Sequence, residues 1–242
     1  MERLAEREEE ILNFILRDYI RSAQPISSSR ISDAGRVEVS PATIRNTMLE
    51  LDEKGFLEKP HTSAGRVPTD KAYRYFVDFL MEPRSANRRA EQTINAAAKK
   101  IRQSHELMFE NLSKAISSEL KLFTGIASFG DEARVSGFGL HDVLEEPEFS
   151  SHDLSVEFAK LVDNLHEVAE SYFDKTSLGA RAFIGNENPT RDAKSFSSVA
   201  LKFKNDELGE CVVFSLGPKR MNYERAFALL DFAVEDLMES FD

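Results

Sequence analysis

The sequence has very little cysteine and no long apolar run. One cysteine, Cys211, is present, so an internal disulfide framework and a multi-cysteine zinc site are both excluded. No stretch approaches the roughly 20 consecutive apolar residues that a membrane-spanning helix needs. The opening stretch, MERLAEREEE, is charged and lacks the apolar core of a secretory signal. We therefore expect a cytoplasmic protein with no membrane partner.

Positive charge is also scarce, and it is unevenly distributed. The chain has 242 residues with 31 Lys and Arg against 42 Asp and Glu, a formal net charge of −11. The segment 17–74 is mildly basic, whereas the remainder of the chain is acidic. Because attraction to phosphates depends on local charge, the segment 17–74 remains suited to a polyanion. A hydrophobic content of 41% is ordinary for a globular protein with a real core.

The first part of the chain shows signals for a run of helices and one hairpin. Apolar residues at helical spacing predict a helix over 8–22, and SSSRISDAG after Pro25 predicts the start and end of another. Ser40 and Pro41 are typical of the N-cap and the first residue of a helix, which we expect to end at Gly55.

A hairpin and a further helix follow. FLEKP and GRVPT predict short strands on either side of a polar tip, HTSA. Thr69 or Asp70 then caps a helix, KAYRYFVDFLM, that stops before Pro83. Helix, helix, helix, hairpin and helix is the order of a winged helix-turn-helix with one appended helix. We assign it to residues 1–83.

The rest of the chain predicts a mixed domain. Residues 84–122 read as a polar linker and one long amphipathic helix, because apolar residues from Ile94 to Leu122 recur at heptad spacing. In residues 123–242, strands are predicted within 123–139 and at ARAFIG, SSVALKF and CVVFSL, with helices over 153–174 and 223–241. The fold class is therefore α+β.

The helix that begins at Pro41 presents polar residues at its N-terminal end. If Ile44, Met48 and Leu51 face the core, the spacing turns the opposite face to solvent. In a major groove Asn pairs with adenine, Arg pairs with guanine, and a small apolar group meets the methyl of thymine. We predict DNA contacts from this turn by Ser40, Ala42, Thr43, Arg45 and Asn46.

The hairpin offers a second set of contacts. His61, Thr62, Ser63 and Arg66 lie on or beside its predicted tip, where contact with a phosphate or the minor groove is expected. Winged helices also serve as protein-interaction modules, so two interpretations stay open. One is a DNA reader, and the other is a ligand- or protein-sensing adaptor without operator-specific binding.

Several motifs resemble a known family. SAQPISS, SPATIRN, LDEKGFLEKPHTSAGRVPT and YRYFVDFLM are similar to the N-terminal domain of the heat-inducible transcription repressor HrcA family, over about residues 8–82. IGNEN and GPKRM, followed by Tyr223, resemble the C-terminal block of that family, and LEEPEF at 144–149 resembles a further segment.

The resemblance implies a homodimeric repressor that binds an inverted repeat, the CIRCE element, ahead of chaperone genes. It also implies that the chaperonin GroE favours the active repressor. Family members carry a GAF-like domain interrupted by an inserted dimerisation domain. Here the predicted 88–122 helix runs almost directly into GIASFGDEARVSGFGLHD, so we expect residues 123–242 to form a reduced GAF-like regulatory and dimerisation domain without the insert.

Other candidate chemistry is weaker. The acidic and histidine-containing run from His141 to Asp153 lacks a recognised metal-ligand spacing, and we interpret it as a solvated loop. GNENPTRD is interpreted as a turn, and GPKRM as a strand-to-helix turn with exposed charges. Cys211 lies in an apolar strand and is expected to be a small buried side chain. We expect no enzyme activity, no metal and no cofactor.

Overall fold

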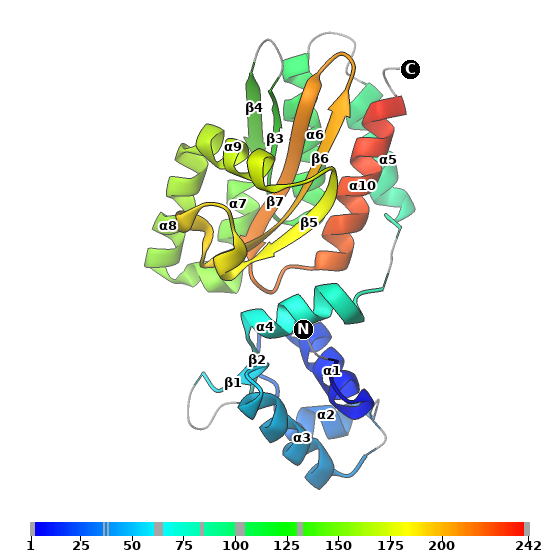
Figure 1. The fold of residues 1–242 in the computed structure, drawn as a ribbon, viewed down its shortest axis with the longest axis vertical. Helices are drawn as coiled ribbons and strands as arrows, with labels where there is room; N and C mark the ends of the chain where they lie inside the picture. The colour runs from blue at the N-terminus through cyan, green and yellow to red at the C-terminus, as the bar shows by residue number, and fades with distance from the viewer. Residues whose placement is uncertain are drawn as a thin grey trace. The chain divides into compact units, whose positions relative to one another are not determined.

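The computed structural model describes residues 3–35, 37, 39–60, 65–82, 85–99, 105–129 and 133–239. The chain divides into two compact units, residues 1–81 and 82–242, and each is described by itself. Both mix helices with antiparallel strands, so the α+β class is confirmed (Figure 1). Among the described residues, no helix combines the length and the apolarity that crossing a membrane requires.

The first unit consists of short helices and a small two-stranded antiparallel sheet. Its elements are α1 (Glu6–Ser22), α2 (Ser28–Ala34), α3 (Pro41–Glu53), β1 (Leu57–Glu58), β2 (Val67–Pro68) and α4 (Asp70–Tyr75), which continues as the π-helix η1 (Phe76–Leu80). This is the order that the sequence predicts, with helix ends shifted by a residue or two.

Local capping explains where these helices begin. The hydroxyls of Ser27, Ser40 and Thr69 accept backbone N–H groups in the first turns of α2, α3 and α4. Each such cap satisfies one of the otherwise unpaired N–H groups at a helix start, a contribution of about 1 kcal/mol. Gly35 follows α2 with φ of 61°, a left-handed conformation that glycine adopts without strain.

The core of the first unit is built around α1. Ile11, Leu12, Ile15 and Leu16 are fully buried, and α1 packs against α2, α3, α4 and β2. Full burial of each such side chain is worth about 1.5–3 kcal/mol relative to exposure. Several buried partners come from the surrounding elements: Ile31, Ile44, Leu51, Phe56, Tyr75 and Phe76.

The second unit has a five-stranded antiparallel sheet in the order β4-β3-β7-β6-β5. The strands are β3 (Phe123–Ser128), β4 (Arg134–Phe138), β5 (Gly179–Ile184), β6 (Phe196–Asn205) and β7 (Gly209–Pro218). β6 and β7 form the longest ladder, a hairpin at the middle of the sheet. The strands predicted within 123–139 and at the three later segments are confirmed.

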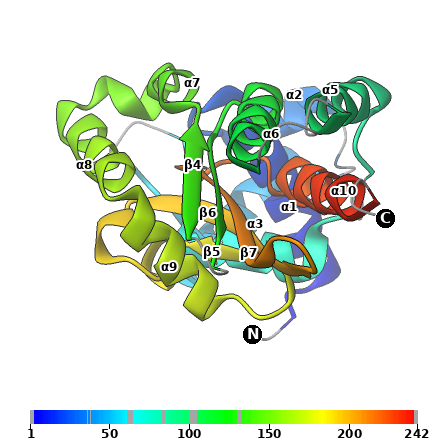
Figure 2. The same cartoon turned by 90° about the horizontal axis from the view of Figure 1, so that it is seen from above.

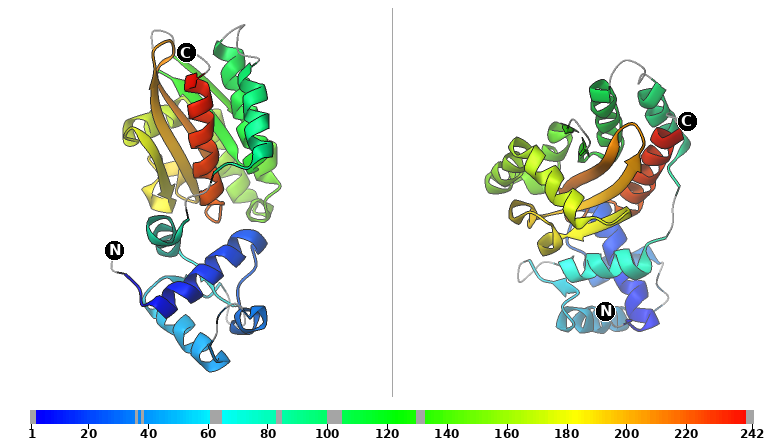
Figure 3. Two further views of the ribbon diagram at one scale, coloured as in Figure 1. Left: turned by 90° about the vertical axis from the view of Figure 1, so that its right-hand side faces the viewer. Right: turned by 45° about the horizontal axis from the view of Figure 1, so that its top comes forward.

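Helices cover both faces of this sheet (Figure 2). On one side lie α6 (His105–Leu120) and α10 (Tyr223–Glu239), with α5 (Arg88–Lys99) packed against both of them (Figure 3). On the other side lie α7 (Leu140–Leu144), α8 (His152–Asp163) and α9 (Leu165–Lys175). Short 3-10 turns complete the unit: η3 (Pro147–Ser150), η4 (Gly185–Glu187) and η5 (Arg191–Ala193).

An aromatic cluster fills the core beneath α8 and α9. Phe158 packs edge-to-face on Phe123 and Phe196, and Tyr172 stacks on Phe214. The Tyr172 hydroxyl donates to the side-chain oxygen of Asn188 at 2.9 Å. Because the side-chain nitrogen of Asn188 also donates to three backbone carbonyls, its buried polar atoms are satisfied. GNENPTRD is thus a structural turn, as predicted.

Two helix predictions are wrong in extent. The single helix predicted over 88–122 is two helices, α5 and α6, packed side by side, and the heptad stripe is divided between them. The helix predicted over 153–174 is also two, because Asn164 ends α8 and precedes α9. A periodic apolar stripe shows which side of a segment is buried, but not whether the chain turns back within it.

Candidate nucleic-acid interface

The helix α3 turns an open polar face to solvent. Ile44 and Leu51 are fully buried and Met48 nearly so, which fixes the inward side of the helix. Ala42, Arg45 and Asn46 are exposed and Thr43 is half-buried. The spacing therefore predicted the placement of these side chains. Their role as DNA contacts remains a prediction.

Hydroxyl groups order the first turn of α3. The Ser40 hydroxyl oxygen accepts the Thr43 N–H at 3.1 Å, and the hydroxyls of the two residues lie 2.9 Å apart. Pro41 at the first helical position needs no hydrogen bond there. The Ser40 cap therefore defines where α3 begins and from which backbone the side chains after it project.

The polar groups of three side chains, Arg45, Asn46 and Lys59, are accessible to a partner. All three are exposed, and within the described part of the chain they make no ion pair or side-chain hydrogen bond. Lys59 directly follows β1 and is not among the predicted DNA contacts. The signal that could have found it is its place beside the predicted hairpin tip in FLEKP.

The acidic groups near α3 lie at its other end, where some are already neutralised. Lys54 donates to Glu8 of α1 at 2.5 Å, and Asp52 pairs with Arg66 at 2.9 Å. Burial raises the pKa of the Glu8 carboxyl, but hydrogen bonds from Lys54 and from the Ala5 N–H outweigh it and lower that pKa. Glu8 therefore stays charged and ties α1 to the C-terminal end of α3.

The predicted DNA contact of Arg66 gains no support from the surroundings of this side chain. Arg66 is 8% exposed, and its guanidinium pairs with Asp52 of α3. Its backbone exchanges two hydrogen bonds with Ile26, at 2.8 and 2.9 Å, which joins the hairpin to the segment before α2. The approach is so close that a Cβ on Gly65 would lie 2.4 Å from the Ile26 carbonyl oxygen. Arg66 is a structural link, whereas His61, Thr62 and Ser63 lie outside the described residues.

A hollow of about 320 Å³ adjoins the open face of α3. Ser27 and Ser28 from the start of α2 line it together with Arg45, Leu49, Lys59 and Arg66, the last of which is paired with Asp52. No carboxylate is among the described residues that line it. Its hydroxyl and cationic groups suit an anionic partner.

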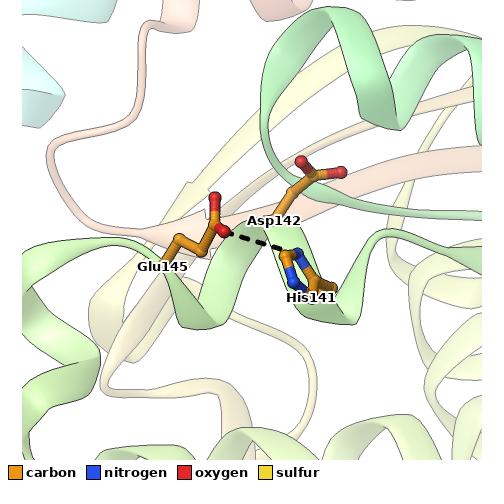
Figure 4. Close-up of side chains that lie close together, drawn as sticks. All are labelled: His141, Asp142 and Glu145. Atoms are coloured by element: carbon orange, nitrogen blue, oxygen red, sulfur yellow. Dashed lines mark ion pairs between the residues drawn. The ribbon is translucent and has the colours of Figure 1, made fainter.

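The histidine and acidic run of the second unit is helical rather than a loop. His141 and Asp142 lie on α7 and Glu145 caps its C-terminal end, with ligand atoms within 4.8 Å of one another (Figure 4). His141 is 85% exposed, and Asp142 already accepts a hydrogen bond from Lys121 at 2.8 Å. Because Lys121 already holds Asp142 and the other two side chains are exposed, we assign no metal to this cluster.

The prediction of exposed charges at GPKRM is wrong for Arg220. Its guanidinium is 10% exposed and forms a bidentate pair with Glu148, at 2.6 and 3.0 Å, and a further pair with Glu146. Burial alone lowers the pKa of this guanidinium, but the two carboxylates outweigh it and raise that pKa. Arg220 therefore fastens the turn before α10 to η3 and is not available to a partner.

Cys211 is fully buried in β7. Burial raises the pKa of its thiol to about 12, so the thiol is protonated at neutral pH and is a poor nucleophile. Its predicted role as a small buried side chain is confirmed.

Comparison with known proteins gives a consistent family match. The family described as "HrcA protein C terminal domain" matches residues 79–227. A "Heat-inducible transcription repressor HrcA" from Carboxydothermus hydrogenoformans is 40% identical over 142 residues, which is 59% of this chain and 41% of the relative. One from Shouchella clausii is 55% identical over 80 residues, 33% of this chain and 23% of the relative. The chain thus matches less than half the length of these relatives.

A solved structure shows the same fold. The crystal structure of a hypothetical protein superposes with a TM-score of 0.78 and covers 99% of each chain. Its sequence identity of 18% is low, so this likeness concerns the fold alone.

Proposed function

This chain belongs to the HrcA family, and from that premise we propose that it is a sequence-specific, DNA-binding repressor of heat-inducible chaperone genes. In this proposal the first unit is a winged helix-turn-helix, with α3 as the recognition helix and the β1–β2 hairpin as the wing. The second unit is a reduced GAF-like domain that regulates the first and forms a homodimer.

The observation that carries the proposal is the open face of α3. Arg45 and Asn46 are exposed there without partners among the described residues, on a helix whose other side is locked into the core. In a major groove these groups match guanine and adenine edges, each good bidentate pair being worth about 1–3 kcal/mol of discrimination. Lys59 supplies a phosphate contact beside them, with His61, Thr62 and Ser63 proposed as the wing tip.

The operator that fits is an inverted repeat. A two-fold homodimer places two copies of α3 in major grooves about 34 Å apart, so the half-sites must lie about one helical turn from each other. An element of the CIRCE type has this symmetry. The family resemblance further favours the chaperonin GroE as a partner that maintains the active repressor.

The test is a comparison of two duplexes at one salt concentration. We expect the protein to bind a CIRCE-type inverted repeat at least about 1,000-fold more tightly than a scrambled duplex of the same composition. Equal affinity for both would exclude operator reading and favour a ligand- or protein-sensing adaptor. Sedimentation of the complex measures stoichiometry, and one chain per operator would contradict the homodimer.

Asn46→Ala sharpens the same test. We expect it to relax base preference at one position of each half-site by roughly 1–3 kcal/mol. The control is Gln92→Ala, an exposed amide on α5 in the other unit, which should leave the base preference unchanged. Uniform weakening on every sequence would instead place Asn46 on the phosphate backbone.

A further inference from the structure

Leu49 is an exposed apolar side chain on the open face of α3. It is 46% exposed, and among the described residues of the first unit it is the one large apolar side chain exposed by more than a third. A leucine in this position contributes little to the core, which Ile44 and Leu51 fill from the opposite side of the helix. Single exposed apolar side chains are common on protein surfaces, so the inference depends on the neighbours of Leu49.

The helical spacing places Leu49 with the proposed base-reading residues. It follows Asn46 by three positions and Arg45 by four, so all three share one side of the helix. The rise of about 1.5 Å per residue puts Leu49 about 4.5 Å beyond Asn46 along the axis.

The hollow that Leu49 lines suits an anionic partner, whereas the exposed Glu53 follows Leu49 by four positions on the same side of the helix. Leu49 lines the hollow of about 320 Å³ together with Arg45, Lys59, Ser27 and Ser28, and no carboxylate is among its described lining residues. A purely apolar protein partner would leave Arg45 and Lys59, which have no partner among the described residues, unpaired. A nucleic-acid groove, with phosphates at its rim and bases within, matches both the charge and the apolar centre.

We propose that Leu49 reads the C5-methyl group of a thymine in the major groove. That methyl is the apolar group that base edges present there, whereas the other groups are hydrogen-bond donors and acceptors. Leu49 thus extends the reading surface by one side chain toward the C-terminal end of α3. The operator half-site carries a thymine next to the base pair that Arg45 or Asn46 contacts. This inference rests on the proposed function.

The experiment replaces thymine by uracil, which lacks the methyl, at one position of the half-site at a time. We expect the wild-type protein to lose about fourfold in affinity at the position that Leu49 reads, the size expected for one buried methyl-sized group. Leu49→Ala should bind the all-thymine operator about fourfold more weakly and show no further loss with uracil at that position. Ala42 and Thr43 are other candidates for methyl contacts, so positions that they read should keep their thymine preference in this variant.

Leu178→Ala is the matched control, because Leu178 is 74% exposed and lies in the second unit. It should keep the wild-type thymine preference at every position. Wild-type affinity that is the same for thymine and uracil throughout the half-site would overturn the inference without any variant. So would a Leu49→Ala protein that keeps every thymine preference. A wild-type protein that does not prefer the operator over scrambled DNA would overturn the proposed function as well. Failure of the Leu49 inference and failure of the proposed function therefore give different results.

Discussion

Two arginines near helix starts have opposite surroundings. Arg45 stands in the second turn of α3, exposed and without a partner among the described residues. Arg220 stands in the turn before α10 and is held by Glu146 and Glu148 at 10% exposure. Both belong to motifs that resemble the same family, SPATIRN and GPKRM. The difference shows that a basic motif is available to a partner only where the fold leaves it without a carboxylate.

Arg66 shows that the distinction does not follow the boundary between the units. It lies in the mildly basic segment 17–74, yet Asp52 neutralises it as the glutamates neutralise Arg220. Lys59, in the preceding strand region, has no such partner among the described residues. The basic character of a segment therefore has to be read residue by residue, after the ion pairs are known.

The largest effect is expected at Arg220. Arg220→Ala leaves two half-buried carboxylates without their cation, so we expect the free energy of unfolding to fall by about 2–4 kcal/mol. Chemical denaturation measures this loss. The control is Arg225→Ala on α10, since Arg225 is 44% exposed and pairs with Glu119 at 3.0 Å. An exposed pair of this kind contributes about 0–1 kcal/mol. Equal losses in the two variants would contradict the structural role of Arg220.

Arg45 should show the reverse behaviour. We expect Arg45→Ala to change the free energy of unfolding by less than about 0.5 kcal/mol, because no described contact is lost. Operator binding should weaken by about 1–3 kcal/mol, mostly as lost preference at one base pair. Binding assays on operators with single base changes measure this. A variant that is destabilised but still discriminates among these operators would make Arg45 a structural residue and remove the contrast with Arg220.

Arg66 tests whether the hairpin depends on its ion pair. We expect Arg66→Ala to lower the free energy of unfolding by about 1–2 kcal/mol, because Asp52 loses a charge-assisted hydrogen bond. A double-mutant cycle with Asp52→Ala isolates the pair, and the two losses should be less than additive. Since the guanidinium faces Asp52, the salt dependence of DNA binding should stay as in the wild type. A reduced salt dependence would return Arg66 to the list of phosphate contacts.

Local signals in the sequence predicted much of the fold and one face of the candidate site. Ser40, Pro41 and Gly55 delimit α3 through interactions within a few residues, and its period alone separates Ile44 and Leu51 from Arg45 and Asn46. The strands of the second unit were predicted for the same reason. Such features depend on neighbours along the chain, which a single sequence displays.

Features that depend on distant partners were not predicted. Arg220 is buried because Glu146 and Glu148, more than 70 positions earlier, fold against it. The helices α5 and α6 pack against each other and against α10, contacts between segments that no local pattern displays. The exposure of Leu49 could have been predicted from its helical spacing from Asn46. It was not, because an apolar residue in a helix is ordinarily assigned to the core.

Lys59→Ala should give the smallest effect on DNA binding. It tests the comparison with a second cation that, like Arg45, has no partner among the described residues. A phosphate contact carries no sequence information, so Lys59→Ala should weaken operator and scrambled DNA by the same factor and leave their ratio unchanged. The slope of log affinity against log salt should become shallower by about 1 per site, the value for one lost phosphate contact. Lys71→Ala is the control, because the Lys71 ammonium donates to the Lys54 carbonyl at 2.6 Å and stacks over Phe56. If both variants changed the salt slope equally, an unpaired cation in this fold would not mark a DNA contact, and the distinction between Arg45 and Arg220 would lose its predictive value.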